Sequence, residues 1–247
     1  MYIPKRLIDT NTHLYCEDFD EDIAQVLNRC LANGVDTLLL PAIDPETYDR
    51  QEQFASCHSR PAIHQMMGLH PTSVKEDWSL LLSEAEKRLF SQPEHYVAVG
   101  EIGLDYYWDR TYEKEQLVVL EHQMDWAQRL GLPVCLHVRK AYEETLHLVH
   151  QQHPTEGRGV MHCFGGSINQ AERAIEQGFY IGIGGVVTFK NAGMADVVRA
   201  IPLERIVLET DAPYLSPVPY RGKRNESAHL LEIAQRVGDI QDVPLSQ

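Results

Sequence analysis

The sequence lacks the features that mark a membrane-spanning or secreted protein. No apolar run approaches the roughly 20 residues that a helix needs to cross a bilayer. Residues 1–10 (MYIPKRLIDT) contain neither a long apolar stretch nor a small-residue cleavage site. The five cysteines are odd in number and form no Cys-x-x-Cys pair, so reduced thiols explain them better than a disulfide framework. We therefore expect a cytoplasmic protein with no membrane partner.

Positive charge is also scarce. The chain has 22 Lys and Arg residues against 36 Asp and Glu residues, a formal net charge of −14. This balance argues against a protein that coats duplex nucleic acid through a broad basic surface. It does not exclude an enzyme that takes in the end of a strand, because a bound metal pair and a few nearby Arg and Lys residues reverse the potential inside one cleft.

A short apolar run followed by an amphipathic stretch recurs about eight times, without low-complexity segments, long linkers or sequence repeats. The runs are rich in β-branched residues and alternate little, which is typical of buried parallel strands. We predict strands at 7–13, 37–42, 63–70, 97–105, 133–138, 159–164, 179–185 and 205–211, and helices near 20–32, 46–58, 76–90, 112–130, 140–152, 168–177, 191–200 and 226–238. Gly34, Gly131 and Gly178 are predicted to end three of these helices.

Eight strand–helix units in 247 residues predict an α/β fold, the closed TIM (β/α)8 barrel, as one domain covering residues 1–247. Two small domains are one alternative. A doubly wound open sheet is another, and it usually has a Gly-rich loop after its first strand. Here the first predicted strand runs into DTNTHLY instead.

Metal-ligand residue types recur at the carboxyl ends of the predicted strands. They are Asp9, Asn11 and His13, then His70, Glu101, Asp105, His137 and Arg139, and finally His162, Glu209 and Asp211. In a barrel these ends meet on one face, where barrel enzymes place their sites. A single His at a strand end is more often structural than a ligand, but the coincidence of several predicts a site for one or two divalent ions. Imidazoles and carboxylates suit Zn, Mn, Fe or Co, and carboxylates also suit Mg.

An aromatic cluster, Tyr106, Tyr107 and Trp108, directly follows the fourth predicted strand. Two interpretations stay open for it. The rings either cap the barrel or stack on a nucleobase.

Eight segments, in order along nearly the whole chain, resemble the TatD family of metal-dependent hydrolases, which are described as deoxyribonucleases. They are DTNTHL at 9–14, GLHP at 68–71, GEIGLDYY at 100–107, LPVCLHVR at 132–139, HCFGGS at 162–167, GFYIGIGG at 178–185, LETDAPYLSP at 208–217 and RGKRNES at 221–227. The resemblance implies a TIM (β/α)8 barrel of the metallo-dependent hydrolase type with one or two metal ions.

Residue roles follow from the resemblance position by position. Glu101 matches the carboxylate that bridges two metals, and His137 and His162 match ligands of the second metal. Asp211 matches the ligand that also orients or deprotonates the attacking water, so Asp211 and Glu101 are the expected catalytic residues. The expected substrate-binding residues are His70, Arg139, Arg221, Arg224 and Tyr106.

The sequence departs from the family pattern in three places. The family's first-strand pair, His-x-His, falls on Asn11 and His13, and Asn is a much weaker ligand than imidazole. The first metal position would keep His13, Glu101 and Asp211, so we expect one well-held ion and one weak or absent ion. Ser227 stands where the family has Pro. The chain ends at Gln247, before the further helix that usually packs under the family's barrel, so we expect a shortened chain.

Three functions are compatible with the sequence. The first is a metal-dependent nuclease that trims DNA from single strands or 3′ ends, with no obligate protein partner. The second is an amidohydrolase-like enzyme acting on another ester or amide, since one fold hosts many chemistries. The third is a catalytically impaired barrel in which Asn11 has abolished the chemistry. The Arg221–Lys223–Arg224 cluster favours a phosphate substrate.

Overall fold

The structure, a computed structural model, describes residues 6–152 and 159–245. In these residues eight strands form one sheet in the order β1-β2-β3-β4-β5-β6-β7-β8, and a helix follows each strand. The predicted TIM (β/α)8 barrel is therefore confirmed. No helix in the described ranges combines the length and the apolar character that a bilayer crossing requires.

The strands and helices occur in the predicted order. The strands are β1 (Leu7–Asp9), β2 (Val35–Leu40), β3 (Ala62–Met67), β4 (Tyr96–Asp105), β5 (Val134–Arg139), β6 (Gly159–His162), β7 (Tyr180–Ile183) and β8 (Ile206–Leu208). The helices are α1 (Ile23–Ala32), α2 (Pro45–Cys57), α3 (Trp78–Ser91), α4 (Glu113–Leu130), α5 (Tyr142–Gln152), α6 (Ile168–Glu176), α7 (Met194–Ala200) and α8 (Leu230–Gln241).

Two compact units make up the chain. The first comprises Met1–Leu40, Gln53–His64 and Gly182–Gln247, and the second comprises Pro41–Glu52 and Gln65–Ile181. That residues 1–247 form a single domain stays a prediction.

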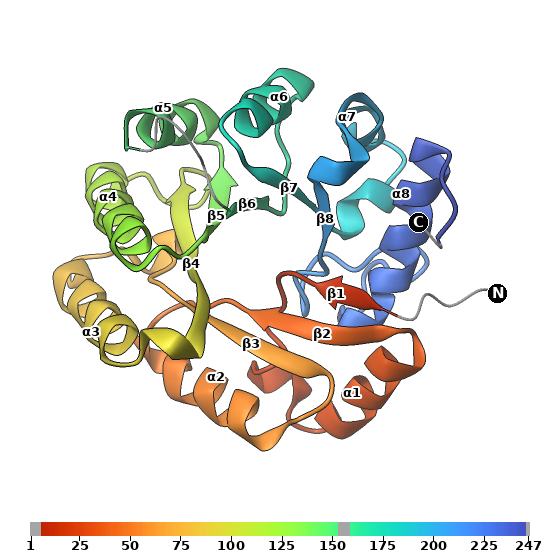
Figure 1. The fold of residues 1–247 in the computed structure, drawn as a ribbon, viewed down its shortest axis with the longest axis horizontal. Helices are drawn as coiled ribbons and strands as arrows, with labels where there is room; N and C mark the ends of the chain where they lie inside the picture. The colour runs from red at the N-terminus through yellow and green to blue at the C-terminus, as the bar shows by residue number, and fades with distance from the viewer. Residues whose placement is uncertain (1–5, 153–158, 246–247) are drawn as a thin grey trace. The chain divides into compact units, whose positions relative to one another are not determined.

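The second unit is built around β4, which is buried from Ala98 to its end at Asp105. It pairs in parallel with β5, and β5 pairs in parallel with β6. Helices α3 to α6 lie outside these strands (Figure 1). Local signals fix the helix ends: Ser167 and Gln170 form a reciprocal capping box at the start of α6. At the predicted position Gly131, a left-handed residue with φ of 66° ends α4.

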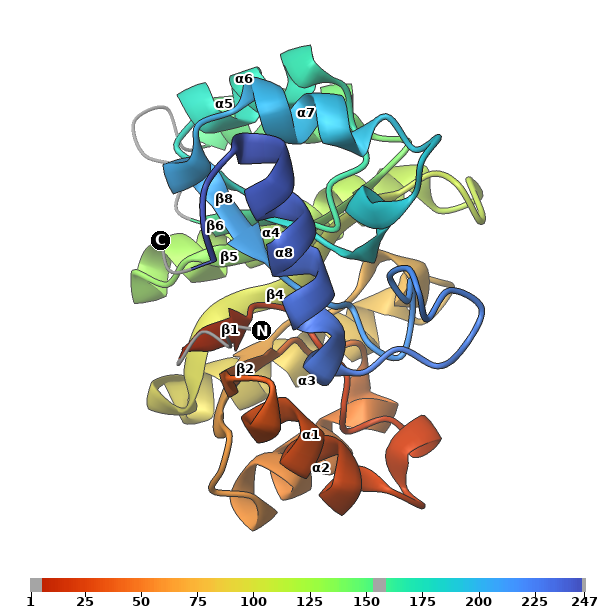
Figure 2. The ribbon, with the colours of Figure 1, turned by 90° about the vertical axis from the view of Figure 1, so that its right-hand side faces the viewer.

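In the first unit, α8 packs against α7 and β8 (Figure 2). Its buried side chains include Leu230, Ile233 and Val237, which recur at helical spacing on one face. The ends of β1 and β8 are joined directly, because the Thr10 amide donates to the Leu208 carbonyl at 3.1 Å.

Several strands end earlier than predicted. β1 stops at Asp9 rather than 13, and β8 stops at Leu208 rather than 211. Beyond Asp9 the amides of Thr10 and Thr12 donate to different strands, to Leu208 O at 3.1 Å and to Leu39 O at 3.2 Å. The backbone therefore no longer pairs with a single neighbour. The polar residues that follow these strands lie in irregular segments.

Candidate active site

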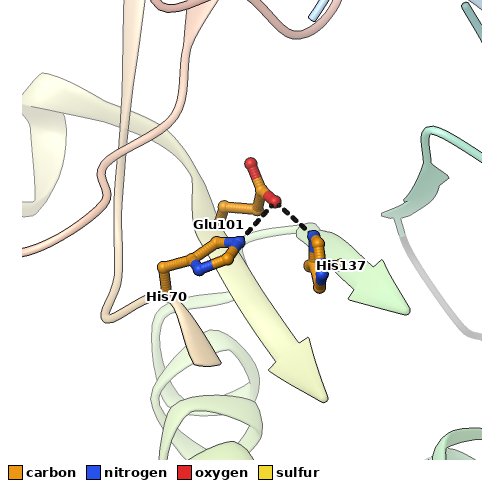
Figure 3. Close-up of side chains that lie close together, drawn as sticks. All are labelled: His70, Glu101 and His137. Atoms are coloured by element: carbon orange, nitrogen blue, oxygen red, sulfur yellow. Dashed lines mark hydrogen bonds and ion pairs between the residues drawn. The ribbon is translucent and has the colours of Figure 1, made fainter. Parts of the chain in front are cut away.

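Three imidazoles of the second unit converge on one carboxylate oxygen. Glu101 Oε1 lies 3.0 Å from His70 Nε2, 2.9 Å from His137 Nδ1 and 2.8 Å from His162 Nε2. Figure 3 shows Glu101 between His70 and His137. The Glu101 side chain is 3% exposed, so this oxygen is removed from bulk water. We call these four residues the Glu101 cluster.

The pairing of β4 with β5 places most of the Glu101 cluster. Glu101, Gly103 and Asp105 share one face of β4, because side chains alternate along a strand. Gly103 pairs with His137, and its φ of 145° suits glycine alone. A Cβ at this position would lie 1.9 Å from the His137 carbonyl oxygen. The missing side chain lets the two strands approach, so the His137 ring reaches both carboxylates.

Asp105 holds His137 from the other side. Its Oδ2 lies 2.9 Å from His137 Nε2, while its Oδ1 accepts the Tyr107 amide at 2.9 Å and the Trp108 amide at 3.3 Å. Gln116 fixes the Asp105 backbone through two hydrogen bonds, of 2.9 and 3.2 Å. A carboxylate that binds the second nitrogen of a ligand His fixes its orientation and raises its basicity.

The charges of the cluster stabilise one another. Burial alone would raise the pKa of Glu101, but the neighbouring His162 and His70 hold it well below the usual range. Burial works to lower the pKa of His137, but hydrogen bonds to Asp105 and Glu101 prevail and raise it. The pKa of Asp105 is lowered by its hydrogen bonds to His137 and to backbone amides, which outweigh burial. The two carboxylates thus favour the protonated form of His137.

His70 differs from the other imidazoles of the cluster. Burial lowers its pKa, which favours a neutral ring. Its Nδ1 accepts the Thr72 amide at 3.2 Å, and an amide can only donate, so the ring proton is on Nε2. That nitrogen faces Glu101. His70, Glu101 and His137 each offer an atom within 4.8 Å of the others, which is close enough for all three to reach one metal ion. In the tautomer set by the Thr72 amide, His70 Nε2 donates a hydrogen bond to Glu101.

Hydrogen bonds at Leu69 and at the His70 amide hold the chain segment that carries His70. Gln123 of α4 accepts the Leu69 amide at 2.7 Å and donates to the Leu69 carbonyl at 3.1 Å. The amide of His70 donates to the Ile43 carbonyl at 2.8 Å. A buried amide side chain thus replaces the strand neighbour that this segment lacks after β3.

The first unit brings together Asn11, His13 and Asp211, which we call the Asp211 group. The Asp211 amide donates to the Asn11 carbonyl at 2.9 Å, and the His13 amide donates to the Ala212 carbonyl at 2.8 Å. The His13 Nε2 lies 3.5 Å from Asp211 Oδ1. Its Nδ1 lies 3.1 Å from the Tyr15 hydroxyl.

A buried polar network holds the two segments of this group in place. Asp9 accepts hydrogen bonds from the Thr210 amide at 2.8 Å and the Thr210 hydroxyl at 2.5 Å. Burial raises the pKa of Asp9 to about 7, against the lowering effect of bonds from Thr210 and Ser227. The Ser227 hydroxyl also lies 3.0 Å from that of Thr12. At this departure from the family pattern, Ser227 therefore joins the polar network.

Comparison with known proteins agrees with this chemistry. Residues 8–247 match the protein family described as TatD related DNase. The chain belongs to the TatD family. It is 34% identical over 248 residues to an uncharacterized metal-dependent hydrolase, YabD, of Bacillus subtilis, across 98% of this chain and 93% of that protein. It is 32% identical over 237 residues to the "3'-5' ssDNA/RNA exonuclease TatD" of Salmonella typhimurium, across 94% and 90%.

Solved structures of TatD-family proteins share the fold. The crystal structure of YjjV, a TatD homologue from Escherichia coli, has a TM-score of 0.90 and 30% identity and covers 97% of this chain and 92% of its own. A TatD-family hydrolase from Entamoeba histolytica has a TM-score of 0.86 at 23% identity, covering 99% and 94%. The chain is accordingly a metal-dependent hydrolase of the TatD family, and its relatives and cluster support a divalent metal ion.

The arginines that the TatD resemblance suggested for substrate binding differ in their surroundings. Arg224 is bound to Asp22 by two hydrogen bonds, of 2.8 and 2.7 Å. Arg221 lies over the Phe189 ring, 4.4 Å from its centroid. Arg139 lies over Tyr107, 3.8 Å from its centroid. An arginine already held by a carboxylate must exchange that partner to bind phosphate, whereas one on a ring face keeps its donors available.

Sequence reasoning did not assign two features of this TatD-family site. Asp105 was noted at a strand end but not as the partner of His137, although its position four residues after Glu101 places both on one strand face. Tyr106 was the suggested substrate-binding aromatic, yet it is 8% exposed, while its successors Tyr107 and Trp108 are 51% and 70% exposed. Exposure at a strand end depends on the turn that follows, and no sequence pattern revealed that turn.

Proposed function

We propose that this protein is a divalent-metal-dependent phosphodiesterase that removes nucleotides from the ends of single-stranded DNA. One observation carries the proposal: three imidazoles converge within 3.0 Å on a single buried oxygen of Glu101. A TatD-family relative named as a 3′-5′ single-stranded DNA/RNA exonuclease supports the substrate class. The net charge of −14 favours strand ends over duplex wrapping.

The donor atoms of the Glu101 cluster suit a divalent cation. Glu101, His137 and His162 supply one oxygen and two nitrogens, the mixture that Zn, Mn, Fe and Co prefer, while Mg relies more on the carboxylate. Contacts of 2.8 and 2.9 Å now hold protons between these atoms, and a cation would take the place of those protons. Asp105 would keep the His137 ring oriented. When bound, the ion supplies Lewis-acid activation of water and of the phosphoryl oxygen.

The chain's own residues would divide the remaining work. His70 carries its proton on Nε2 and can donate it in a hydrogen bond to a phosphoryl oxygen. Asp211 would accept a proton from the attacking water, a role that follows from the family resemblance. Arg139, Arg221 and Arg224 would bind phosphates as cations, Arg224 after exchanging its Asp22 partner.

Asn11 favours an enzyme with one well-held ion. A neutral amide replaces the imidazole in the Asp211 group, which leaves His13 as its single imidazole. The Glu101 cluster keeps all of its ligands. We therefore propose about one ion per chain, where an unimpaired pair of positions would hold about two. If the loss of this metal position abolishes hydrolysis altogether, the protein is a barrel whose catalysis Asn11 has impaired.

The test combines metal analysis with hydrolysis. The metal content of the purified protein is measured, and cleavage of single-stranded DNA labelled at either end is followed after EDTA treatment and after Mg or Mn is restored. We expect stepwise shortening from the 3′ end that EDTA abolishes and metal restores. Cleavage of an amide or a non-phosphate ester in place of DNA would overturn the proposal in favour of an amidohydrolase-like enzyme.

Glu101→Ala is the decisive variant. Glu101 contacts all three imidazoles of the cluster, so its loss should remove bound metal and lower DNA hydrolysis together, by about a thousandfold. His122→Ala, which removes an exposed imidazole on α4, is the control and should keep both. A fully active Glu101→Ala protein would contradict the proposed mechanism.

A further inference from the structure

Two neighbouring aromatic rings are exposed immediately after β4. Tyr107 and Trp108 are 51% and 70% exposed, and their ring centroids lie 5.0 Å apart at an interplanar angle of 85°. Large aromatic side chains of a single folded chain are normally buried, and two adjacent exposed rings form a patch that commonly marks a binding site. Tyr106, by contrast, is buried and belongs to the core.

A cation lies on this patch. The Arg139 guanidinium is 3.8 Å from the Tyr107 centroid and 5.2 Å from the Trp108 centroid. Within residues 6–152 and 159–245, Arg139 forms no ion pair with an acidic side chain. Arg110, on the same loop, instead pairs with Glu113. Arg139 therefore keeps its charge and its donors available in a chain of strongly negative net charge.

The patch is tied to the Glu101 cluster through Asp105. One oxygen of this carboxylate accepts the amides of Tyr107 and Trp108, and the other lies 2.9 Å from His137 Nε2. Asp105 and Arg139 are also paired in register across β4 and β5. The aromatic turn, Arg139 and the His137 imidazole are thus connected through the hydrogen bonds of Asp105 and the pairing of β4 with β5.

We propose that Tyr107, Trp108 and Arg139 form a nucleotide subsite next to the Glu101 cluster, and this inference rests on the proposed function. An unpaired base stacks on the exposed Trp108 ring, with the Tyr107 ring nearly perpendicular beside it, and Arg139 binds an adjoining phosphate. A base inside a duplex has both faces covered by its neighbours, so the subsite selects unpaired strands. Stacking tolerates any base, which gives recognition without sequence preference.

The test distinguishes the contribution of the bases to binding from that of the phosphates. Fluorescence anisotropy measures binding of an oligothymidylate of about eight nucleotides and of an abasic strand of equal length. EDTA is present, so no turnover occurs. The wild-type protein should bind the base-bearing strand about tenfold more tightly than the abasic strand. Trp108→Ala should abolish this preference. Arg139→Gln should instead weaken the binding of both strands by the same factor and lower the salt dependence of that binding.

Tyr180→Ala is the matched control, since it removes an exposed aromatic ring from the amino end of β7. It should leave the preference unchanged. A preference that survives Trp108→Ala, or a wild-type protein that binds both strands equally, overturns the subsite. A change in self-association by Trp108→Ala without a change in strand binding overturns it as well. Base-dependent binding without any hydrolysis would retain the subsite and reject the proposed function.

Discussion

The Glu101 cluster and the Asp211 group use the same residue types but differ in what they can bind. In the Glu101 cluster, three imidazoles share one buried carboxylate oxygen, and a second carboxylate orients His137. In the Asp211 group, the single imidazole of His13 lies 3.5 Å from Asp211 beside a neutral Asn11. Ligand capacity therefore depends on how many ionisable donors share one point, and residues of the right type at a strand end are not enough.

The largest expected effect comes from removing one imidazole from each side of this comparison. His162→Ala should lower metal affinity by more than the roughly 10–100-fold that loss of an outer partner costs. His13→Ala should change the affinity of the well-held ion much less, because that ion depends on the Glu101 cluster. Titration with Mn or Zn, followed by calorimetry, measures both. Equal losses in the two variants would show that the two sets hold the same ion.

A smaller effect should follow from loosening the Glu101 cluster without removing a ligand. Asp105→Asn keeps an oxygen for the Tyr107 and Trp108 amides but removes the negative charge beside His137. Metal affinity should fall by about 10–100-fold with little change in thermal stability. Asp109→Asn, a carboxylate on the same exposed loop, is the control and should retain wild-type affinity. Unchanged affinity in Asp105→Asn would mean that Asp105 only shapes the turn.

The smallest expected effect comes from adding an imidazole to the Asp211 group, so that it resembles the Glu101 cluster more closely. Asn11→His restores a second imidazole and should raise metal content from about one to about two ions per chain, with a severalfold gain in DNA hydrolysis. Elemental analysis and initial rates measure these changes. Asn191→His, which adds an imidazole at an exposed position, should alter neither. Unchanged metal content and rate in Asn11→His would show that position 11 is irrelevant to the site.

The sequence alone determined the architecture and named the residues that we expect to bind metal. Apolar runs of strand length, separated by amphipathic stretches, predicted eight strand–helix units, because buried parallel strands and surface helices impose these patterns directly on the chain. The same patterns placed Glu101 on the fourth strand and His137 and His162 at the ends of the fifth and sixth. The exact ends of β1 and β8 were predicted too late, since the predicted strands included the polar residues 10–13 and 209–211, which lie beyond the point where the backbone hydrogen bonds change partner.

Only the tertiary structure decided how these residues meet. No local pattern encodes that Glu101 Oε1 serves three imidazoles, that the Thr72 amide places the His70 proton on Nε2, or that Asp22 already binds Arg224. Tyr106 and Trp108 are two residues apart, yet one is buried and the other exposed. These outcomes depend on distances of about 3 Å between segments remote in sequence, which the packing of strands and turns sets.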